Sequence, residues 1–120
     1  MGKLTSAQLT YLQEERRLAR LATADSSGLP QVTPVGMWTY NNELDTIDIG
    51  GRNFATTKKY RNVEENPHAA LVVDDLASVD PWRPRAVMIQ GRAQAINNEG
   101  EWGTPIIRIA LDNVVSWGLD

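Results

Sequence analysis

Short apolar segments separated by only a few turn-forming residues constrain the fold of this chain more than any other feature. Residues 18–24 read LARLATA, with apolar and polar side chains alternating, and DSSG follows directly. Residues 31–40 form the next extended segment, and residues 46–51 form a third after an Asn-Asn pair. A period of two predicts β-strands, and Asp, Asn, Ser and Gly are typical turn residues. Because connections this short do not cross a sheet, neighbouring strands are expected to pair antiparallel.

A short helix is predicted in each half of the chain. Near the N-terminus, Thr5 and Gln8 have the spacing of a capping box, and Leu9 and Leu12 mark one helix face. Residues 54–66 place apolar side chains at helical spacing again, until an Asn-Pro pair ends the helix.

Four further strands are predicted over residues 68–74, 86–96, 106–111 and 114–117. Gly91 marks a weak point in one of them, and Pro34 marks an edge or a bulge in the strand over residues 31–40. The fold class is therefore mainly β (α+β), with six or seven antiparallel strands and two short helices. Closure into a small barrel would hide the sheet edges. A length of 120 residues suits a single domain over residues 1–120.

Composition excludes several classes of function. The chain has no cysteine and one histidine, His68, so thiol nucleophiles and cysteine-based or multi-histidine metal sites are excluded. A net charge of -3 argues against general nucleic-acid binding. The longest apolar runs, such as residues 69–73, are too short to cross a membrane, and the N-terminus lacks the apolar core of a secretion signal. We expect a cytoplasmic protein without a metal site, in which His68 is structural or lies on the surface.

The segment TIDIGGRNFATTKKYRN carries the clearest indication of a ligand. A predicted strand ends in Gly50 and Gly51, where a flat molecule can approach the backbone closely. The following helix begins with Thr57, Lys58 and Lys59, although cations at the positive end of a helix dipole cost about 0.3–1 kcal/mol each. Free N–H groups, hydroxyls and ammonium groups together favour an anionic ligand. A solvated helix face remains an alternative for the same residues.

Two other segments contain tryptophan. Residues 80–85 read DPWRPR and place Trp82 with two guanidinium groups on a constrained loop, suited to stacking on a flat ring or binding an acid. A stiff loop whose tryptophan seals a core edge is the alternative. Residues 114–118 read VVSWG, which we interpret as a core strand with Trp117 at a barrel end or a subunit interface. Motifs for a phosphate-binding loop or a nucleophile elbow are missing, so an enzyme of this sequence would use a cofactor.

These segments, taken in order, resemble a known family. They are LARLATAD, GLPQVTPVG, TIDIGG, KKYRNVEENPHAALVVDDL, VDPWRPRAVMIQGRA, IIRI and VVSWG, and they span nearly the whole chain. The sequence is similar to the pyridoxamine 5'-phosphate oxidase-like group and, within it, to the small oxidoreductases that use the deazaflavin coenzyme F-420. The resemblance implies a split β-barrel and a homodimer with its cofactor sites at the subunit interface.

The resemblance also implies which residues bind the cofactor. The phosphate would be held at the start of the second helix, and the ring would lie against the backbone of two neighbouring strands. The residues are Thr57, Lys58, Lys59 and Asn62 for the phosphate; Pro34, Val35, Gly36, Gly50 and Gly51 for the ring; and Arg52 and Trp82 for the ring edge or the tail.

The reaction that the resemblance implies is hydride transfer between coenzyme F-420 and a small conjugated or heteroaromatic substrate, without a catalytic acid or base from the protein. Two segments depart from the family pattern. Basic residues often precede VVSWG in the group, whereas residues 110–113 read ALDN, so no contact to the cofactor tail is assigned there. Residues 97–105 are short and acidic, which predicts a reduced wall on the substrate side. Two alternatives stay open: an FMN-binding oxidoreductase of the same fold, and a non-catalytic protein that binds a flavin, a deazaflavin or haem.

Overall fold

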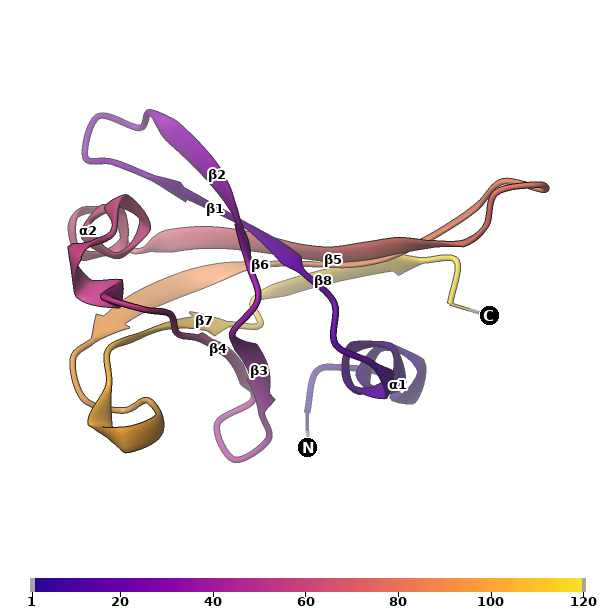
Figure 1. Ribbon diagram of the computed structural model, residues 1–120, viewed down its shortest axis with the longest axis horizontal. Helices are drawn as coiled ribbons and strands as arrows, with labels where there is room; N and C mark the ends of the chain where they lie inside the picture. Colours follow the sequence, from indigo (N-terminus) through magenta and orange to yellow (C-terminus); the bar gives the residue numbers. More distant parts are fainter. Residues whose placement is uncertain (1, 120) are drawn as a thin grey trace.

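The computed structural model describes residues 2–119, which form eight strands and two short α-helices (Figure 1). The strands are β1 Ala19–Ala24, β2 Pro30–Val35, β3 Trp38–Asn41, β4 Thr46–Ile49, β5 His68–Ser78, β6 Arg83–Ile96, β7 Ile106–Ala110 and β8 Asn113–Trp117. The helices are α1 Ser6–Glu14 and α2 Lys58–Glu65, with the 3-10 turns η1 Phe54–Thr56 and η2 Glu101–Gly103. The expected mainly β fold is confirmed. Neither α-helix within residues 2–119 is long and apolar enough to span a membrane.

The strands form one antiparallel sheet that curls into a split barrel. Their order is β2-β1-β5-β6-β7-β4-β3, and β8 pairs with β6 beside this path. The two ends of the sheet, β2 and β3, follow one another in the chain, and the barrel is split between them. The split β-barrel implied by the resemblance is therefore confirmed.

Strand β6 joins the two halves of the barrel. Its residues 86–90 pair with β8 and with part of β5, whereas residues 93–96 pair with β7. Gly91 lies between these two stretches, where an added Cβ would be 1.9 Å from the carbonyl oxygen of Ala110. Only a glycine lets the end of β7 approach this closely, which explains the weak point in the sequence pattern.

Apolar residues at every second strand position pack inside the curl. The largest of the fully buried side chains are Leu21, Ile47, Ile49, Leu71, Ile89, Ile107 and Ile109. In β4, Ile47 and Ile49 face the core, whereas Asp48 between them faces the other side. A register slip of one residue would exchange the two faces, so burial of this set fixes the register.

The strand expected over residues 31–40 is divided in two. β2 ends at Val35 and β3 begins at Trp38, with a bend at Gly36 between them. Arg16 supports this bend by donating hydrogen bonds to the carbonyl oxygens of Gly36 and Trp38. The division raises the number of strands from the expected six or seven to eight.

The segment expected as a loop before residue 86 is mostly strand. β5 and β6 stay paired out to Ser78 and Arg83, and the hairpin projects well beyond the rest of the molecule in Figure 1. Trp82 lies at its tip and is 65% exposed. The alternative that Trp82 seals a core edge is therefore wrong.

Strand β8 is an outer strand of the sheet. It pairs with β6, and its residues alternate between exposed and half-buried positions. Trp117 is 47% exposed, so the interpretation of VVSWG as a core strand is wrong. A place for Trp117 at a subunit interface stays a prediction.

Helix α1 is attached to the base of the β5–β6 hairpin by a closed group of charges. The buried Arg17 donates to Asp75 and Glu14, and its guanidinium lies 4.0 Å from the centre of the Tyr11 ring. Arg85 donates to both carboxylate oxygens of Asp75, and the Tyr11 hydroxyl donates to one of them. The hydrogen bonds from Arg85, and then those from Tyr11 and Arg17, lower the pKa of Asp75 to about 2 despite its partial burial. Both cations of this group therefore face carboxylates.

Candidate functional site

Helix α2 begins with a well-formed N-cap. Thr57 has an extended backbone conformation, and its hydroxyl oxygen accepts from the Tyr60 N–H at 3.3 Å while donating to the carbonyl oxygen of Phe54. The N–H groups of the first turn have no partner inside a helix, and Thr57 satisfies one of them. The remaining N–H groups point out of the helix start and can bind an anion.

Two lysines surround this helix start. Lys58 is exposed, and Lys59 is partly exposed with its Nζ 5.8 Å from the centre of the Phe54 ring. The first turn contains no acidic residue, and no ion pair found within residues 2–119 includes either lysine. The positive end of the helix dipole and two ammonium groups thus act together.

Polar contacts hold α2 in place on the sheet. The buried Asn62, 2% exposed, donates through Nδ2 to the Thr23 hydroxyl of β1 at 3.1 Å. The Tyr60 hydroxyl donates to Asn97 after β6, at 2.8 Å. Asn62 therefore lies beneath the helix, away from the exposed face that carries Lys58, and its amide is used in positioning the helix.

A cavity of about 480 Å³ lies beside Gly50 and Gly51. A Cβ built on Gly50 would meet only Ile106, at 4.0 Å, so the glycine leaves the backbone open on the cavity side. Gly50 also donates its N–H to the carbonyl oxygen of Met37 at 2.8 Å, which holds the end of β4 against the bend at Gly36. The structure thus brings Gly36, Gly50 and Gly51 together, as the resemblance implies.

The other two predicted ring contacts lie at the end of β2. Pro34 is exposed, whereas the side chain of Val35 is buried in the core, so only the backbone of Val35 is available to a ligand. Two side-chain oxygens earlier in β2, Gln31 Oε1 and Thr33 Oγ1, are buried without a hydrogen-bond partner among the described residues. Buried polar atoms usually have partners, so this strand has hydrogen-bonding capacity that the protein itself does not use.

One wall of the cavity carries a half-buried ion pair. Arg108 donates to both carboxylate oxygens of Asp48 at 3.0 Å and to Glu99. Burial alone would raise the pKa of Asp48, but hydrogen bonds from Arg108, Asn41 and Thr46 bring the pKa below its usual value. Asp48 is therefore a charged, fixed part of the wall, unsuited to donating a proton.

Two of the residues predicted to contact the cofactor do not line the cavity beside Gly50. Arg52 is exposed in the loop between Gly51 and η1. Trp82 lies at the tip of the hairpin, and Figure 1 shows that tip and α2 at opposite ends of the long axis of the molecule. One chain therefore cannot bring Trp82 to the start of α2.

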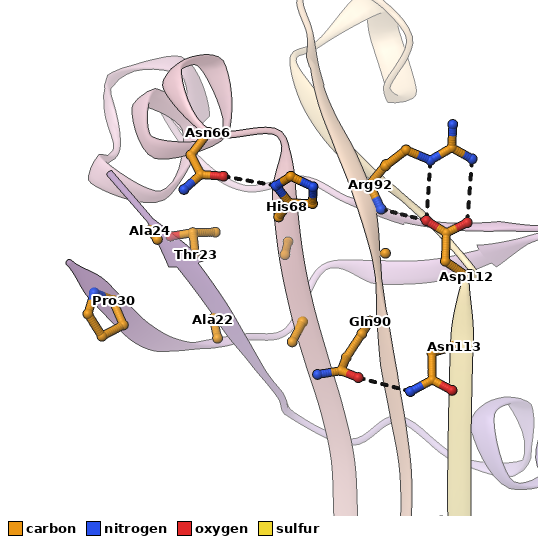
Figure 2. Close-up of a pocket in the computed structure, with 13 residues that line it drawn as sticks. Ala22, Thr23, Ala24, Pro30, Asn66, His68, Gln90, Arg92, Asp112 and Asn113 are labelled. Carbon is orange, nitrogen blue, oxygen red and sulfur yellow. Dashed lines mark hydrogen bonds and ion pairs between the residues drawn. The ribbon is translucent and has the colours of Figure 1, made fainter. Parts of the chain in front are cut away.

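A second cavity, of about 580 Å³, lies on the outer face of the sheet formed by β1, β5, β6 and β8 (Figure 2). His68 lines it, is exposed, and has its Nδ1 3.2 Å from the Asn66 amide oxygen. The surface position predicted for His68 is thus confirmed. Across the cavity, Arg92 forms an ion pair with Asp112, and Gln90 accepts a hydrogen bond from Asn113. Its polar side chains are therefore largely paired with one another.

Sequence reasoning missed two residues of the cavity beside Gly50. Arg16 follows the first helix and has no motif around it, yet it reaches the bend at Gly36, and its guanidinium lies 5.6 Å from the Trp38 ring centre. Trp102 lies in the acidic segment expected to give a reduced wall, and the structure instead places it along the cavity. The one signal in the sequence for Trp102 is its place in a short polar turn. A tryptophan there is not expected to be buried in the core, so its presence points to another role.

The comparisons with known proteins agree with this architecture. Residues 5–110 match the family model described as pyridoxamine 5'-phosphate oxidase. The 5a,11a-dehydrotetracycline/5a,11a-dehydrooxytetracycline reductase of Streptomyces rimosus subsp. rimosus is 38% identical over 121 residues, which is 97% of this chain and 84% of that protein.

Solved structures share the fold at low sequence identity. HupZ of Group A Streptococcus superposes with a TM-score of 0.74 at 15% identity, over 96% of this chain and 95% of that chain. An F-420 reductase superposes with a TM-score of 0.66 at 18% identity, over 88% of this chain and 94% of that chain. The family match covers most of the sequence, and the Streptomyces relative is similar over nearly all of it. The chain belongs to the pyridoxamine 5'-phosphate oxidase family.

Proposed function

We propose that this protein is an oxidoreductase that uses coenzyme F-420 to reduce a small conjugated or heteroaromatic substrate. The observation that carries the proposal is the 38% identity to a reductase over 97% of this chain. That relative acts on a polycyclic dehydrotetracycline, so a conjugated carbonyl compound of similar size is the first substrate to test.

The start of α2 fits the phosphate of such a cofactor. Thr57, Lys58 and Lys59 combine free N–H groups with two ammonium groups that take part in no ion pair within residues 2–119, although the charge of Lys58 does interact with Asp25. We therefore retain the two lysines and Thr57 as phosphate contacts and assign Asn62 to holding the helix.

The open backbone at Gly36 and Gly50 fits the flat ring, and Gly51 beside them has room for no side chain because an added Cβ would lie 3.0 Å from the Phe54 ring. When bound, the deazaflavin supplies the hydride, and solvent supplies the proton that completes the reduction. The protein fixes the ring and shapes the substrate pocket, and we assign no residue as a catalytic acid or base.

Trp82 fits the proposal only in a homodimer. Its distance from α2 along the molecule means that Trp82 of the partner subunit, and not that of the same chain, would reach the cofactor. We propose that the cofactor lies at the subunit interface. The exposed Arg52 would then contact the ring edge or the tail.

Two alternatives make different predictions. FMN has a tricyclic ring and a phosphate but no acidic oligoglutamate tail, so only coenzyme F-420 should gain salt-sensitive affinity. A non-catalytic binding protein, for a flavin, a deazaflavin or haem, would bind its ligand without turnover. The identity to a reductase favours the enzyme.

A fluorescence titration of the purified protein with coenzyme F-420, with FMN in parallel at low and high salt, tests the cofactor. We expect a dissociation constant of about 1 μM or below for coenzyme F-420 and much weaker binding of FMN. Preference for FMN would move the protein to the FMN-dependent part of the family. Binding of coenzyme F-420 without turnover of a panel of conjugated acceptors, 5a,11a-dehydrotetracycline among them, would favour the carrier.

A further inference from the structure

Trp102 is held on the surface in an unusual conformation. Its side chain is 93% exposed, and its backbone has a φ of 62° and a ψ of 25°. A bulky residue rarely adopts this left-handed conformation, which costs on the order of 1 kcal/mol. Neither core packing nor backbone preference explains a tryptophan here, so its ring is available to a ligand.

The turn that carries Trp102 is tightly built. The Gly100 N–H donates to the Thr104 carbonyl oxygen at 2.8 Å, and the Thr104 hydroxyl donates to the Glu101 carbonyl oxygen at 2.7 Å. A Cβ on Gly100 would lie 2.7 Å from the Thr104 carbonyl oxygen, which belongs to the backbone, so the turn closes only with glycine at that position. The turn therefore fixes the backbone of Trp102 along the cavity of about 480 Å³.

The charges along this cavity are unequally distributed. Three of the four charged residues that line it are carboxylates, namely Asp48, Glu99 and Glu101, and the fourth is Arg16. Arg108 pairs with Asp48 and Glu99, whereas no ion pair within residues 2–119 includes Glu101. Arg16 donates to backbone carbonyls at the Gly36 bend. The stretch beside Trp102 thus combines an exposed aromatic face with an unneutralised carboxylate.

We propose that Trp102 and Glu101 bind the substrate of the reductase, and that they select flat ring systems that carry a positive charge. A cation on an aromatic substrate gains from the Trp102 ring face and from the Glu101 carboxylate at the same time. This inference rests on the proposed function for the role of substrate, but the cavity and its charges stand independently of it.

The consequence is that charge separates the two ligands. The anionic cofactor is attracted to Lys58 and Lys59 at the start of α2, and Glu101 disfavours the same anion at the Trp102 end. A cationic substrate is repelled by the two lysines and attracted by Glu101. Each ligand therefore binds weakly at the site of the other.

Two flat tricyclic probes of opposite charge test the inference, the proflavine cation and the anthracene carboxylate anion. Their binding to the whole cofactor-free chain is measured by fluorescence anisotropy. We expect proflavine to bind more tightly. Trp102→Ala should weaken proflavine binding about tenfold and Trp102→Phe less than about threefold, since phenylalanine retains an aromatic face.

Variants at Glu101 isolate the contribution of charge. Glu101→Gln should weaken proflavine binding about threefold and leave anthracene carboxylate binding equal or stronger. Glu43→Gln, which removes an exposed carboxylate from the β3–β4 turn, is the matched control and should change neither. Circular dichroism checks that each variant is folded.

The outcomes separate this inference from the proposed function. Equal binding of the two probes, or wild-type proflavine binding by folded Trp102→Ala, would overturn the inference. If proflavine binding depends on Trp102 but coenzyme F-420 does not bind, the cavity inference holds and the proposed function fails. If coenzyme F-420 binds with unchanged affinity in Glu101→Gln while KM for a cationic acceptor rises and kcat does not, both hold.

Discussion

The two helices of this protein use basic residues in opposite ways. Beside α1, Arg17 and Arg85 enclose the Tyr11 ring and share the carboxylate of Asp75. At the start of α2, Lys58 and Lys59 lie on the positive end of a helix, and no ion pair within residues 2–119 includes them. The first group neutralises itself and holds two elements together. The second is repelled by its own helix dipole and is stabilised further when an anion binds.

This difference shows why a basic residue alone does not indicate a binding site. An arginine with a carboxylate partner of its own contributes to folding, and a ligand would have to displace that partner. A cation without a partner contributes little to folding and is available for binding. Substitutions in the group beside α1 should therefore lower the stability of the protein, whereas substitutions at the start of α2 should lower its affinity for the cofactor.

The largest effect is expected for Asp75→Ala. The substitution leaves the buried Arg17 and the half-buried Arg85 without their shared carboxylate, which should lower the free energy of unfolding by about 3 kcal/mol. Urea unfolding measures the change. Affinity for the cofactor in the folded protein should stay at the wild-type value, and a selective loss of affinity with full stability would contradict the distinction between the two groups.

Lys59→Ala should produce the reverse pattern. Loss of a charge-assisted hydrogen bond to the phosphate should weaken binding of coenzyme F-420 by about 1.5–3 kcal/mol. Stability should be unchanged or slightly higher, because the helix dipole no longer opposes this charge. Arg61→Ala, an exposed cation of the same helix, is the control in the fluorescence titration. Unchanged affinity in Lys59→Ala would refute the phosphate contact.

Strong acid should weaken the attachment of α1. The pKa of Asp75 is about 2 in the folded protein, below the value of about 3.9 for an unperturbed Asp, so its stabilisation is complete above about pH 4 and is lost as the pH falls towards 2. Unfolding in urea between pH 5 and pH 2 should show this decrease. Asp75→Asn should be less stable at neutral pH and should show a shallower decrease with acid.

The smallest change in stability is expected at an exposed arginine–aspartate ion pair, which has the same residue types as the α1 group but is not buried. Arg20 and Asp74 form an ion pair of 2.8 Å, but each side chain is about half exposed. Asp74→Ala should lower the free energy of unfolding by less than about 0.5 kcal/mol, because solvent screens the pair. A loss as large as that of Asp75→Ala would show that burial does not explain the difference between them.

Local patterns in the sequence predicted most of the fold. The capping box at Thr5 and Gln8 is present, and α2 ends before Asn66 as expected. The bend at Gly36 was missed because the apolar alternation continues through it, and the side chain that supports it, Arg16, is distant in sequence. The length of the β5–β6 hairpin was missed because Pro81 and Pro84 indicate a loop, although Pro84 is paired in the strand.

For the candidate site, too, the sequence indicates residues that are close together in the chain and misses those that depend on distant contacts. Thr57, Lys58 and Lys59 are consecutive, so one segment of sequence identifies them. The hydrogen bond between Asn62 and Thr23 of β1 could not be predicted, because helical spacing alone does not show what the amide meets. Trp102 was missed because its conformation depends on Gly100 and Thr104 closing the turn, which no periodicity reveals.

The pairing of strand β6 also affects how the protein unfolds. It shares backbone hydrogen bonds with β5, β7 and β8, so neither half of the barrel can unfold while the other half keeps all of its partners. We therefore expect the barrel to be one cooperative unit in which the amide hydrogens of residues 86–96 of β6 exchange with solvent only on global unfolding. The hairpin tip over residues 79–82 lies beyond the last paired residues and projects from the rest of the molecule in Figure 1, so we expect its amides to exchange without unfolding of the barrel.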